Sequence, residues 1–178
     1  MLGVLTLGVL AGLLITVALS LLILVYQASR PSVAVLGKVP GKQAYGDIEQ
    51  YPKNEAIPGL LMIRPDVQFF FANNTTFRNR VRNLLSTIEP SPRAVLIDLE
   101  ASARLDIDSI EMLTDLQTEL KAKGIELLLA NVRAPVRDVL QRSGLIERIG
   151  KQHIYLSDEE GVRAFQDGSR RESNREEI

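Results

Sequence analysis

An uncharged apolar run opens the chain, and a sequence with mixed apolar and charged positions follows it. Residues 1–29 carry no charged side chain, and the hydroxyl residues Thr6, Thr16 and Ser20 interrupt the apolar stretch. A helix rises about 1.5 Å per residue, so roughly twenty apolar residues cross a hydrocarbon core of about 30 Å. This run is longer, and no basic residues precede it, which favours a membrane span over a cleaved signal peptide. We therefore predict a transmembrane helix over 1–29.

Residues 30–57 are rich in glycine and proline, and we predict a juxtamembrane linker there with one short strand at 33–36. Two apolar runs follow at 59–63 and 67–71, with the turn residues 64–66 between them. Short apolar runs bounded by such turn residues are typical of strands. We therefore predict that these two runs form strands.

Apolar positions then change to helical spacing. From Asn74 onward one helical face collects apolar residues until two prolines end it: Phe77, Val81, Leu84, Leu85 and Ile88. Segments 94–97 and 125–129 are apolar throughout, as strands buried on both faces are. Alternating strands and helices predict an α/β fold over 58–168, with a mixed, partly parallel sheet flanked by helices.

The helix between those two strands is expected to start at an acidic residue. Asp108 and Glu111 have the spacing of an N-cap residue and its partner in a capping box. Gly124 supplies the residue that commonly follows a helix end. We therefore predict that Asp108 caps this helix.

The last third of the chain is expected to contain a helix, a short strand and the start of a second helix. A helix with proline near its start is expected over 134–144, and a short strand over 153–156. A second capping box is expected at 157–160. The final stretch, 169–178, has little to bury and is predicted to be disordered.

The distribution of charged residues argues against one class of partner and predicts the orientation of the span. The 178 residues include 21 basic and 22 acidic ones without a long block of either sign, which argues against nucleic acid as a partner. Arg30, Lys38 and Lys42 precede the first acidic residue, Asp47. Positive residues beside a span favour the cytoplasmic side. We therefore predict an integral protein of the plasma or inner membrane whose domain is cytoplasmic.

An ordered set of short motifs connects these elements to a known family. The motifs are Arg30-Pro31, Val35-Leu36-Gly37, Val39-Pro40-Gly41, GLLMIR at 59–64, FFAN at 70–73, VLID at 95–98, IDS at 107–109, GIELLLAN at 124–131 and VRDVLQRSGL at 136–145. The set resembles the STAS domain (sulfate transporter and anti-sigma factor antagonist). It resembles more closely the carboxyl end of SulP-family anion permeases, a final transmembrane helix followed by a STAS domain.

The resemblance implies the regulatory and scaffold end of a SulP-type secondary transporter for sulfate or a related anion. SulP proteins have many spans, and their substrate site lies among spans that precede this region. A single apolar helix without an ionisable residue offers no ion path, so we do not expect this polypeptide to transport alone. The implied partners are the remaining transmembrane bundle, the lipid bilayer and a second copy of the chain.

An Asp-Ser pair supports a second interpretation. In the anti-sigma antagonist branch, the serine of such a pair at a helix start is phosphorylated, and Ser109 after Asp108 matches that position. A helix start favours a phosphate through its unpaired N–H groups and its dipole. Nearby Asp106 and Glu111 add opposing negative charge, and Ile110 and Glu111 replace the motif's small residue and glycine. The alternatives are a membrane-tethered signalling module switched at Ser109, or an ordinary helix cap with Ser109 facing solvent or a partner.

Gly8 and Gly12 lie four residues apart within the predicted span. Small residues at this spacing allow a second helix to approach closely in a membrane. We predict that the pair packs against another transmembrane helix; the alternative is that glycine is simply frequent in such segments.

The sequence gives no sign of an enzyme, a cofactor or a metal site. With His153 as its single histidine and no cysteine, the chain has few bases for nucleophilic catalysis and no metal-ligand spacing. The stretch 37–43 fails as a phosphate-binding loop, because three residues separate its glycines and Gln43 follows the lysine. We expect no catalytic residue, no cofactor and no metal ligand.

Overall fold

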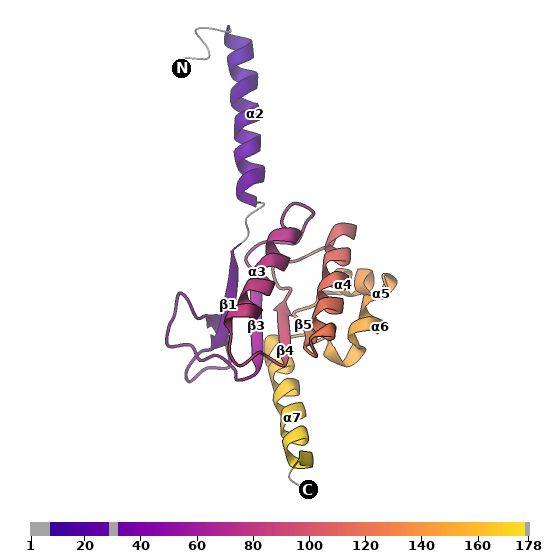
Figure 1. The fold of residues 1–178 in the computed structure, drawn as a ribbon. Helices are drawn as coiled ribbons and strands as arrows, with labels where there is room; N and C mark the ends of the chain where they lie inside the picture. The colour runs from indigo at the N-terminus through magenta and orange to yellow at the C-terminus, as the bar shows by residue number, and fades with distance from the viewer. Residues whose placement is uncertain (1–7, 29–31, 177–178) are drawn as a thin grey trace.

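The computed structural model describes residues 8–28 and 32–176, with side chains placed for 8–26 and 32–169. An apolar helix, α2 (Val9–Ala28), stands apart from a domain in which a five-stranded sheet is flanked by helices (Figure 1). The last helix, α7 (Asp158–Glu176), runs away from the domain on the side opposite to α2. The predicted α/β fold class is confirmed.

α2 confirms the helix predicted from the apolar run. Its stretch Val9–Tyr26 is long and apolar enough to cross a membrane, and only 6% of the residues in this stretch are buried. Thr16 Oγ1 donates to the Gly12 carbonyl and Ser20 Oγ to the Thr16 carbonyl, both at 2.8 Å, so these hydroxyls are satisfied within the helix. Thr6 lies outside the described residues. Because its large apolar side chains are exposed, α2 does not resemble the core helix of a soluble domain.

The sheet has the strand order β2-β1-β3-β4-β5. β1 (Val33–Lys38) pairs antiparallel with β2 (Tyr45–Asp47) and β3 (Leu60–Pro65), whereas β3, β4 (Ala94–Asp98) and β5 (Glu126–Ala130) run parallel. The carboxyl ends of the three parallel strands therefore lie together, and we call this end the carboxyl end of the sheet. Val33 pairs with Pro65 there, so the chain that follows α2 enters the sheet at its carboxyl end.

Residues 33–57, predicted to be a linker with one short strand at 33–36, contribute two strands to the sheet. β1 confirms the predicted strand, whereas β2 was not predicted. Val33 and Leu36 of β1 are buried, and Lys38 bridges to Glu55 beyond the named strands. A Cβ atom on Gly37 would lie 2.8 Å from the Glu55 carbonyl oxygen, so this glycine permits a close backbone approach. The structure thus places 33–57 in the domain and not in a linker.

The predicted strand at 67–71 is wrong: this segment is a loop. Phe69 is buried, its ring centroid lies 4.6 Å from that of Phe77, and its backbone N–H donates to the Ser102 hydroxyl at 3.4 Å. The apolar pattern was misleading because Phe69 fills the core from a loop whose backbone N–H is satisfied by a side chain.

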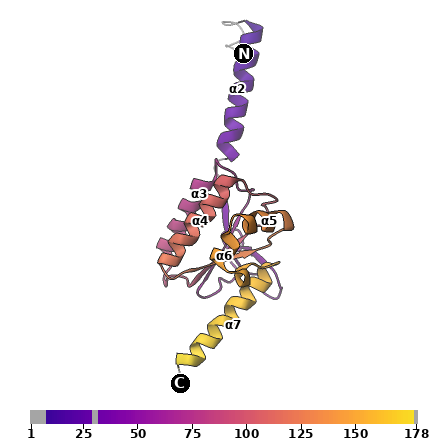
Figure 2. The ribbon, with the colours of Figure 1, turned by 90° about the vertical axis from the view of Figure 1, so that its right-hand side faces the viewer.

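Four helices cover one face of the sheet. α3 (Asn74–Thr87) and α4 (Ile107–Ala122) lie side by side, with α5 (Ala134–Arg142) and α6 (Leu145–Ile149) beyond them (Figure 2). Their apolar faces bury the larger core, whose fully buried members include Ile63, Phe77, Val81, Val95, Ile97, Leu113, Leu129, Val136 and Leu140. The helices predicted from Asn74 and over 134–144 are confirmed, with the latter ending at Arg142.

α7 covers the other face, where a smaller apolar cluster contains Leu60, Met62, Leu96, Leu128 and Val162. The helix lies very close to β4, because a Cβ atom on Gly161 would stand only 2.5 Å from Leu96 Cδ1. α7 continues through Glu176, over a stretch whose composition predicts disorder from residue 169.

The segment before α7 also differs from the prediction. Residues 153–156 form no strand: His153 ends a short 3-10 helix (Lys151–His153), and Ile154 makes one parallel bridge to Leu129. The capping box at 157–160 is half formed. The Ser157 hydroxyl accepts from the Glu160 N–H at 3.2 Å, but the Glu160 carboxylate accepts from the N–H of Leu156 instead of that of Ser157.

Candidate functional site

The start of α4 is capped by Asp106 and not by Asp108. The helix begins at Ile107, and the Asp106 carboxylate accepts from the Ser109 backbone N–H at 2.8 Å. Asp106 has extended backbone angles, with ψ 175°, as an N-cap residue does. The predicted N-cap, Asp108, was therefore wrong by two residues. Aspartate is a favoured N-cap residue at either position, and only the backbone conformation distinguishes the two. Asp108 lies exposed in the first turn.

Ser109 is fully buried between α3 and α4. Its hydroxyl donates to the Asp106 carboxylate and lies 3.2 Å from the side-chain amide of Asn74, the first residue of α3. The hydroxyl therefore connects the starts of two helices. The expectation of a solvated or partner-facing Ser109 is wrong. Its phosphorylation stays a prediction, and a kinase reaches this hydroxyl only after the first turn of α4 opens.

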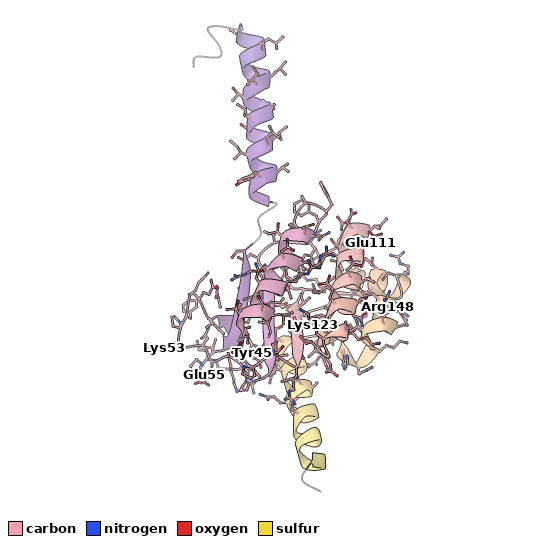
Figure 3. The ribbon with its side chains drawn as sticks, in the orientation of Figure 1. Tyr45, Lys53, Glu55, Glu111, Lys123 and Arg148 are labelled. Atoms are coloured by element: carbon pink, nitrogen blue, oxygen red, sulfur yellow. The ribbon has the colours of Figure 1, made fainter. Side chains whose placement is uncertain are left out.

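Two large apolar side chains are exposed beside this cap. Phe71 and Ile107 are 69% and 78% exposed, and the Phe71 N–H donates to the Asp106 carboxylate at 3.0 Å. Asp108 and Glu111 are exposed on the first turns of α4, and Glu111 lies at the end of the domain nearer to α2 (Figure 3). We call Phe71, Ile107, Asp108 and Glu111 the α4-start surface.

A cluster of charged side chains occupies the carboxyl end of the sheet, and its two aspartates are buried. Arg64 of β3 donates through Nε to Asp98, the last residue of β4, and through Nη2 to Asp158 of α7 at 3.1 Å. The exposed Glu100 lies 3.6 Å from the same Nη2 atom. One guanidinium group thus faces three carboxylates. Among residues 8–28 and 32–176, no group of three or more His, Asp or Glu side chains is arranged to hold a metal ion.

Asp98 is fully buried and fully hydrogen-bonded. Its Oδ1 accepts from Asn131 Nδ2 and from the Glu100 N–H, both at 2.8 Å, while its Oδ2 accepts from Arg64. Arg64, Asp98 and Asn131 stand at or just after the ends of the three parallel strands, and parallel strands bring such residues to one end of a sheet. The motifs contained all three residues, but only the strand directions bring them together. No sequence motif pointed to Asp158, because its place in the cluster depends on how α7 docks on the sheet.

The surroundings of Asp158 favour the protonated form of its carboxyl group. Burial, followed by the charge of Asp98, raises the pKa of Asp158 to about 6, against the opposing effect of Arg64. Its Oδ1 atom is buried and has no hydrogen-bond partner among the described residues. A carboxyl group with such a pKa changes its charge close to the pH of a cell interior.

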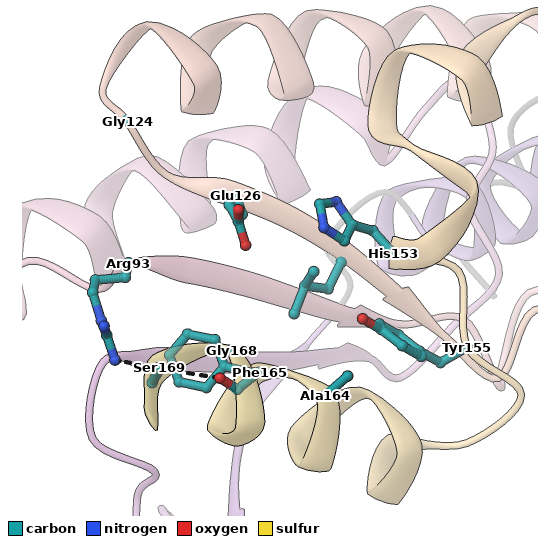
Figure 4. Close-up of a pocket in the computed structure, with 10 residues that line it drawn as sticks. Arg93, Gly124, Glu126, His153, Tyr155, Ala164, Phe165, Gly168 and Ser169 are labelled. Atoms are coloured by element: carbon teal, nitrogen blue, oxygen red, sulfur yellow. Dashed lines mark hydrogen bonds between the residues drawn. The ribbon is translucent and has the colours of Figure 1, made fainter. Parts of the chain in front are cut away.

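A cavity of about 330 Å³ lies between β5 and α7, toward the opposite end of the sheet (Figure 4). Arg93, just before β4, stands with its guanidinium carbon 5.3 Å from the centroid of the Phe165 ring and donates to Ser169 Oγ at 2.6 Å. His153 also lines it, with Nδ1 3.0 Å from the Ile149 carbonyl oxygen. The contacts of Arg93 with Phe165 and Ser169 fasten α7 at the amino end of β4. α7 is thus attached at both ends of the sheet.

The two glycines of the span differ in their positions. Gly8 precedes α2 with a φ of +82°, and its carbonyl accepts from the Gly12 N–H at 3.1 Å. Gly8 therefore starts the helix, whereas Gly12 lies within it. The packing role of the pair stays a prediction.

A family model for the STAS domain matches residues 51–161, more than half of the chain. The chain belongs to the STAS domain family. The match includes the strands β3, β4 and β5, the start of α4 and the charged cluster at the carboxyl end of the sheet. The sequence resemblance to STAS domains is confirmed.

This STAS chain is also homologous to sulfate transporters. It is 36% identical over 166 residues to a probable sulfate transporter of Mycobacterium tuberculosis (strain ATCC 25618 / H37Rv), an alignment that covers 92% of this chain and 29% of that protein. The chain spans less than a third of the length of the curated relatives it matches. The similarity extends beyond the STAS domain and includes most of the chain.

Solved structures share the fold. The murine Slc26a9 anion transporter in its inward-facing state matches 88% of this chain and 25% of its own, with a TM-score of 0.77 and 22% identity. A putative anti-sigma factor antagonist from Thermotoga maritima matches 61% of this chain and 88% of its own, with a TM-score of 0.53 and 17% identity. The similarity to the transporter covers the larger share of the chain.

Proposed function

We propose that this chain is the regulatory and scaffold end of a SulP-type secondary transporter for sulfate or a related anion. In this role α2 is one span of a larger membrane bundle, and the STAS domain lies in the cytoplasm. α2 has no Asp, Glu, Lys, Arg or His residue and therefore offers no ion path. The chain alone neither transports an anion nor catalyses a reaction. Its homology to the mycobacterial protein supports sulfate as the transported anion.

The observation that supports this proposal most strongly is the short connection between α2 and the sheet. Residues 29–32 separate Ala28 from Val33, and an extended chain advances at most about 3.5 Å per residue, so the two residues lie within about 18 Å of each other. With α2 in the bilayer, the carboxyl end of the sheet is held next to the membrane surface. The domain therefore acts where the loops of the other spans emerge.

The charges around this connection support a cytoplasmic domain. Arg30, Lys38 and Lys42 follow α2 before the first acidic residue, Asp47. Positive residues close to a span favour the cytoplasmic side of a membrane. The amino end of α2 then lies on the opposite side.

The α4-start surface fits the cytoplasmic face of a membrane bundle. Phe71 and Ile107 offer exposed apolar area, and Asp108 and Glu111 surround it with negative charge. Cytoplasmic loops of membrane proteins are enriched in Lys and Arg, which complement such a surface. We infer that these loops, in the same transporter or in the second copy of a dimer, contact the α4-start surface.

Assembly with the missing spans tests this function. The chain and the preceding transmembrane part of a SulP transporter are expressed together or separately, and co-purification and sulfate uptake are measured. We expect uptake only when both parts are present. Phe71→Ser combined with Ile107→Ser should reduce co-purification, whereas Leu156→Ser, at another exposed apolar residue, should not. Uptake by the chain alone, or failure of the two parts to associate, would contradict the proposal.

A membrane-tethered module of the anti-sigma antagonist type is the second candidate. The shared fold with the Thermotoga maritima protein and the position of Ser109 in the first turn of α4 favour it. A phosphate on Ser109 would lie beside the Asp106 carboxylate, so repulsion would separate the starts of α3 and α4. The full chain and a Ser109→Ala variant are incubated with a serine kinase of the anti-sigma type, and their masses are measured. An unchanged mass of the unsubstituted chain rejects this candidate.

A further inference from the structure

The contact between α7 and the carboxyl end of the sheet has an imbalance of charge. Arg64 supplies the cation for Asp98 and Asp158, and Glu100 lies near the same guanidinium group. Ionised, these four side chains carry one positive and three negative charges. The side chain of Asp98 is fully buried and that of Asp158 is 10% exposed, so water screens their repulsion poorly.

The hydrogen bonds of the two buried acids are unequal. Both carboxylate oxygens of Asp98 accept hydrogen bonds, whereas Asp158 uses only Oδ2, toward Arg64. Asp158 Oδ1 is buried without a partner among the described residues. A buried carboxylate oxygen without a donor is unfavourable, and the same oxygen is a ready position for a proton.

We propose that Asp158 is a proton-binding site that controls how firmly α7 is held on the sheet. A proton taken from solvent binds to the carboxylate of Asp158, removes one of the negative charges around Arg64 and turns an acceptor into an O–H donor. No other bond forms or breaks. The docked helix is stabilised by proton binding, and loss of the proton loosens its first turns.

The other charged groups around Asp158 do not reverse this response. Tyr45 of β2 faces Asp158 and Glu159, and burial together with these charges raises the pKa of its hydroxyl, which stays neutral near pH 7. Glu159 is exposed, and the carboxylate of Glu160 accepts from the Leu156 N–H. Arg64 keeps its charge throughout and opposes protonation only in part.

The direction of the response follows from proton linkage. The pKa of Asp158 is about 6 in the docked state against an ordinary value of 3.8, so the docked state binds more protons between these two values. Docking is therefore strongest at low pH and weakens as pH rises toward 6, above which no further change comes from this group. Between about pH 7.5 and about pH 5 the docking equilibrium should strengthen about tenfold.

Hydrogen–deuterium exchange of the full chain in detergent micelles measures this equilibrium. We expect amides in the first turns of α7 to exchange about tenfold more slowly at about pH 5 than at about pH 7.5, after correction for intrinsic exchange. Asp158→Asn mimics the protonated form and should abolish this difference. Glu159→Gln removes a neighbouring exposed charge and should keep it.

A second measurement needs no substitution. The carboxyl carbon resonance of Asp158 in the labelled full chain should titrate with a midpoint of about 6. A midpoint near the ordinary value of 3.8, or α7 exchange in the unsubstituted chain that does not respond to pH after correction, would overturn the proposal. The inference does not depend on the transporter assignment, because neither measurement involves transport.

Discussion

The backbone N–H of Phe71 donates a hydrogen bond of 3.0 Å to the carboxylate of Asp106, which also caps α4. One side chain therefore fixes both the loop after β3 and the start of a helix. This contact holds the exposed Phe71 and Ile107 on neighbouring segments at the end of the domain that α2 enters. The α4-start surface is thus a defined feature of the fold.

Replacing Asp106 by Ala should remove this double contact. We expect the free energy of unfolding to fall by about 1–2 kcal/mol, as for other lost N-caps. Urea unfolding of the full chain in micelles, followed by circular dichroism, measures the change. Asp108→Ala is the matched control, since it removes the same charge from the start of the same helix without removing a cap. It should cost less than Asp106→Ala, about 0.3–1 kcal/mol. Equal losses would contradict the assignment of the cap.

A methyl group at Gly161 should disturb the docking of α7. Its Cβ would lie 2.5 Å from Leu96 Cδ1 and 3.2 Å from the Tyr155 ring, and Leu96 is fully buried and cannot move freely. We expect Gly161→Ala to lower the free energy of unfolding by about 1–3 kcal/mol. In the same helix Gly168 has no atom within 4 Å of such a Cβ, so Gly168→Ala should be neutral or stabilise slightly. A lower melting temperature for Gly161→Ala than for Gly168→Ala would support the close packing of α7 on β4. Equal or reversed melting temperatures would contradict it.

Arg64 should be far more important for stability than an exposed arginine. Arg64→Met leaves Asp98 buried without its cation, and we expect a loss of about 3 kcal/mol in the free energy of unfolding. Arg82→Met breaks the exposed pair with Glu119 and should change stability little. Similar unfolding midpoints for the two variants would show that the buried cluster is not held by Arg64.

Added bulk at Gly12 should weaken helix association in the membrane. Gly12 lies within α2, so Gly12→Leu places a large side chain where a second helix is expected to approach. We expect reduced co-purification with the other spans. Ala18→Leu adds bulk at another position of α2 and serves as the control. Gly8 is a poor test, because its φ of +82° would strain any larger residue.

Local patterns were sufficient to predict most of the fold. The apolar run predicted α2, and the wholly apolar stretches at 94–97 and 125–129 became β4 and β5. Each of these signals comes from residues adjacent in the chain. The short strand predicted at 33–36 became β1, but its extension to Lys38 and the whole of β2 were not predicted. Gly37 owes its role to a contact with Glu55 that the sequence pattern does not show.

The candidate site was harder to predict from the sequence, because it depends on contacts between residues far apart in the chain. Ser109 was identified from its motif, but its burial depends on Asn74 in a different helix. Arg64, Asp98 and Asn131 were all quoted in the family motifs, yet only parallel strand directions bring them together. Asp158 required the docked position of α7.

Membrane fractionation tests the central claim most directly. The full chain is expressed in bacterial cells, its membranes are washed with alkaline carbonate, and its carboxyl end is probed with protease in intact and opened cells. The account predicts that the chain stays in the washed membranes and that its carboxyl end is cleaved only after the cells are opened. A chain released as a soluble protein, or one cleaved from outside intact cells, would contradict it.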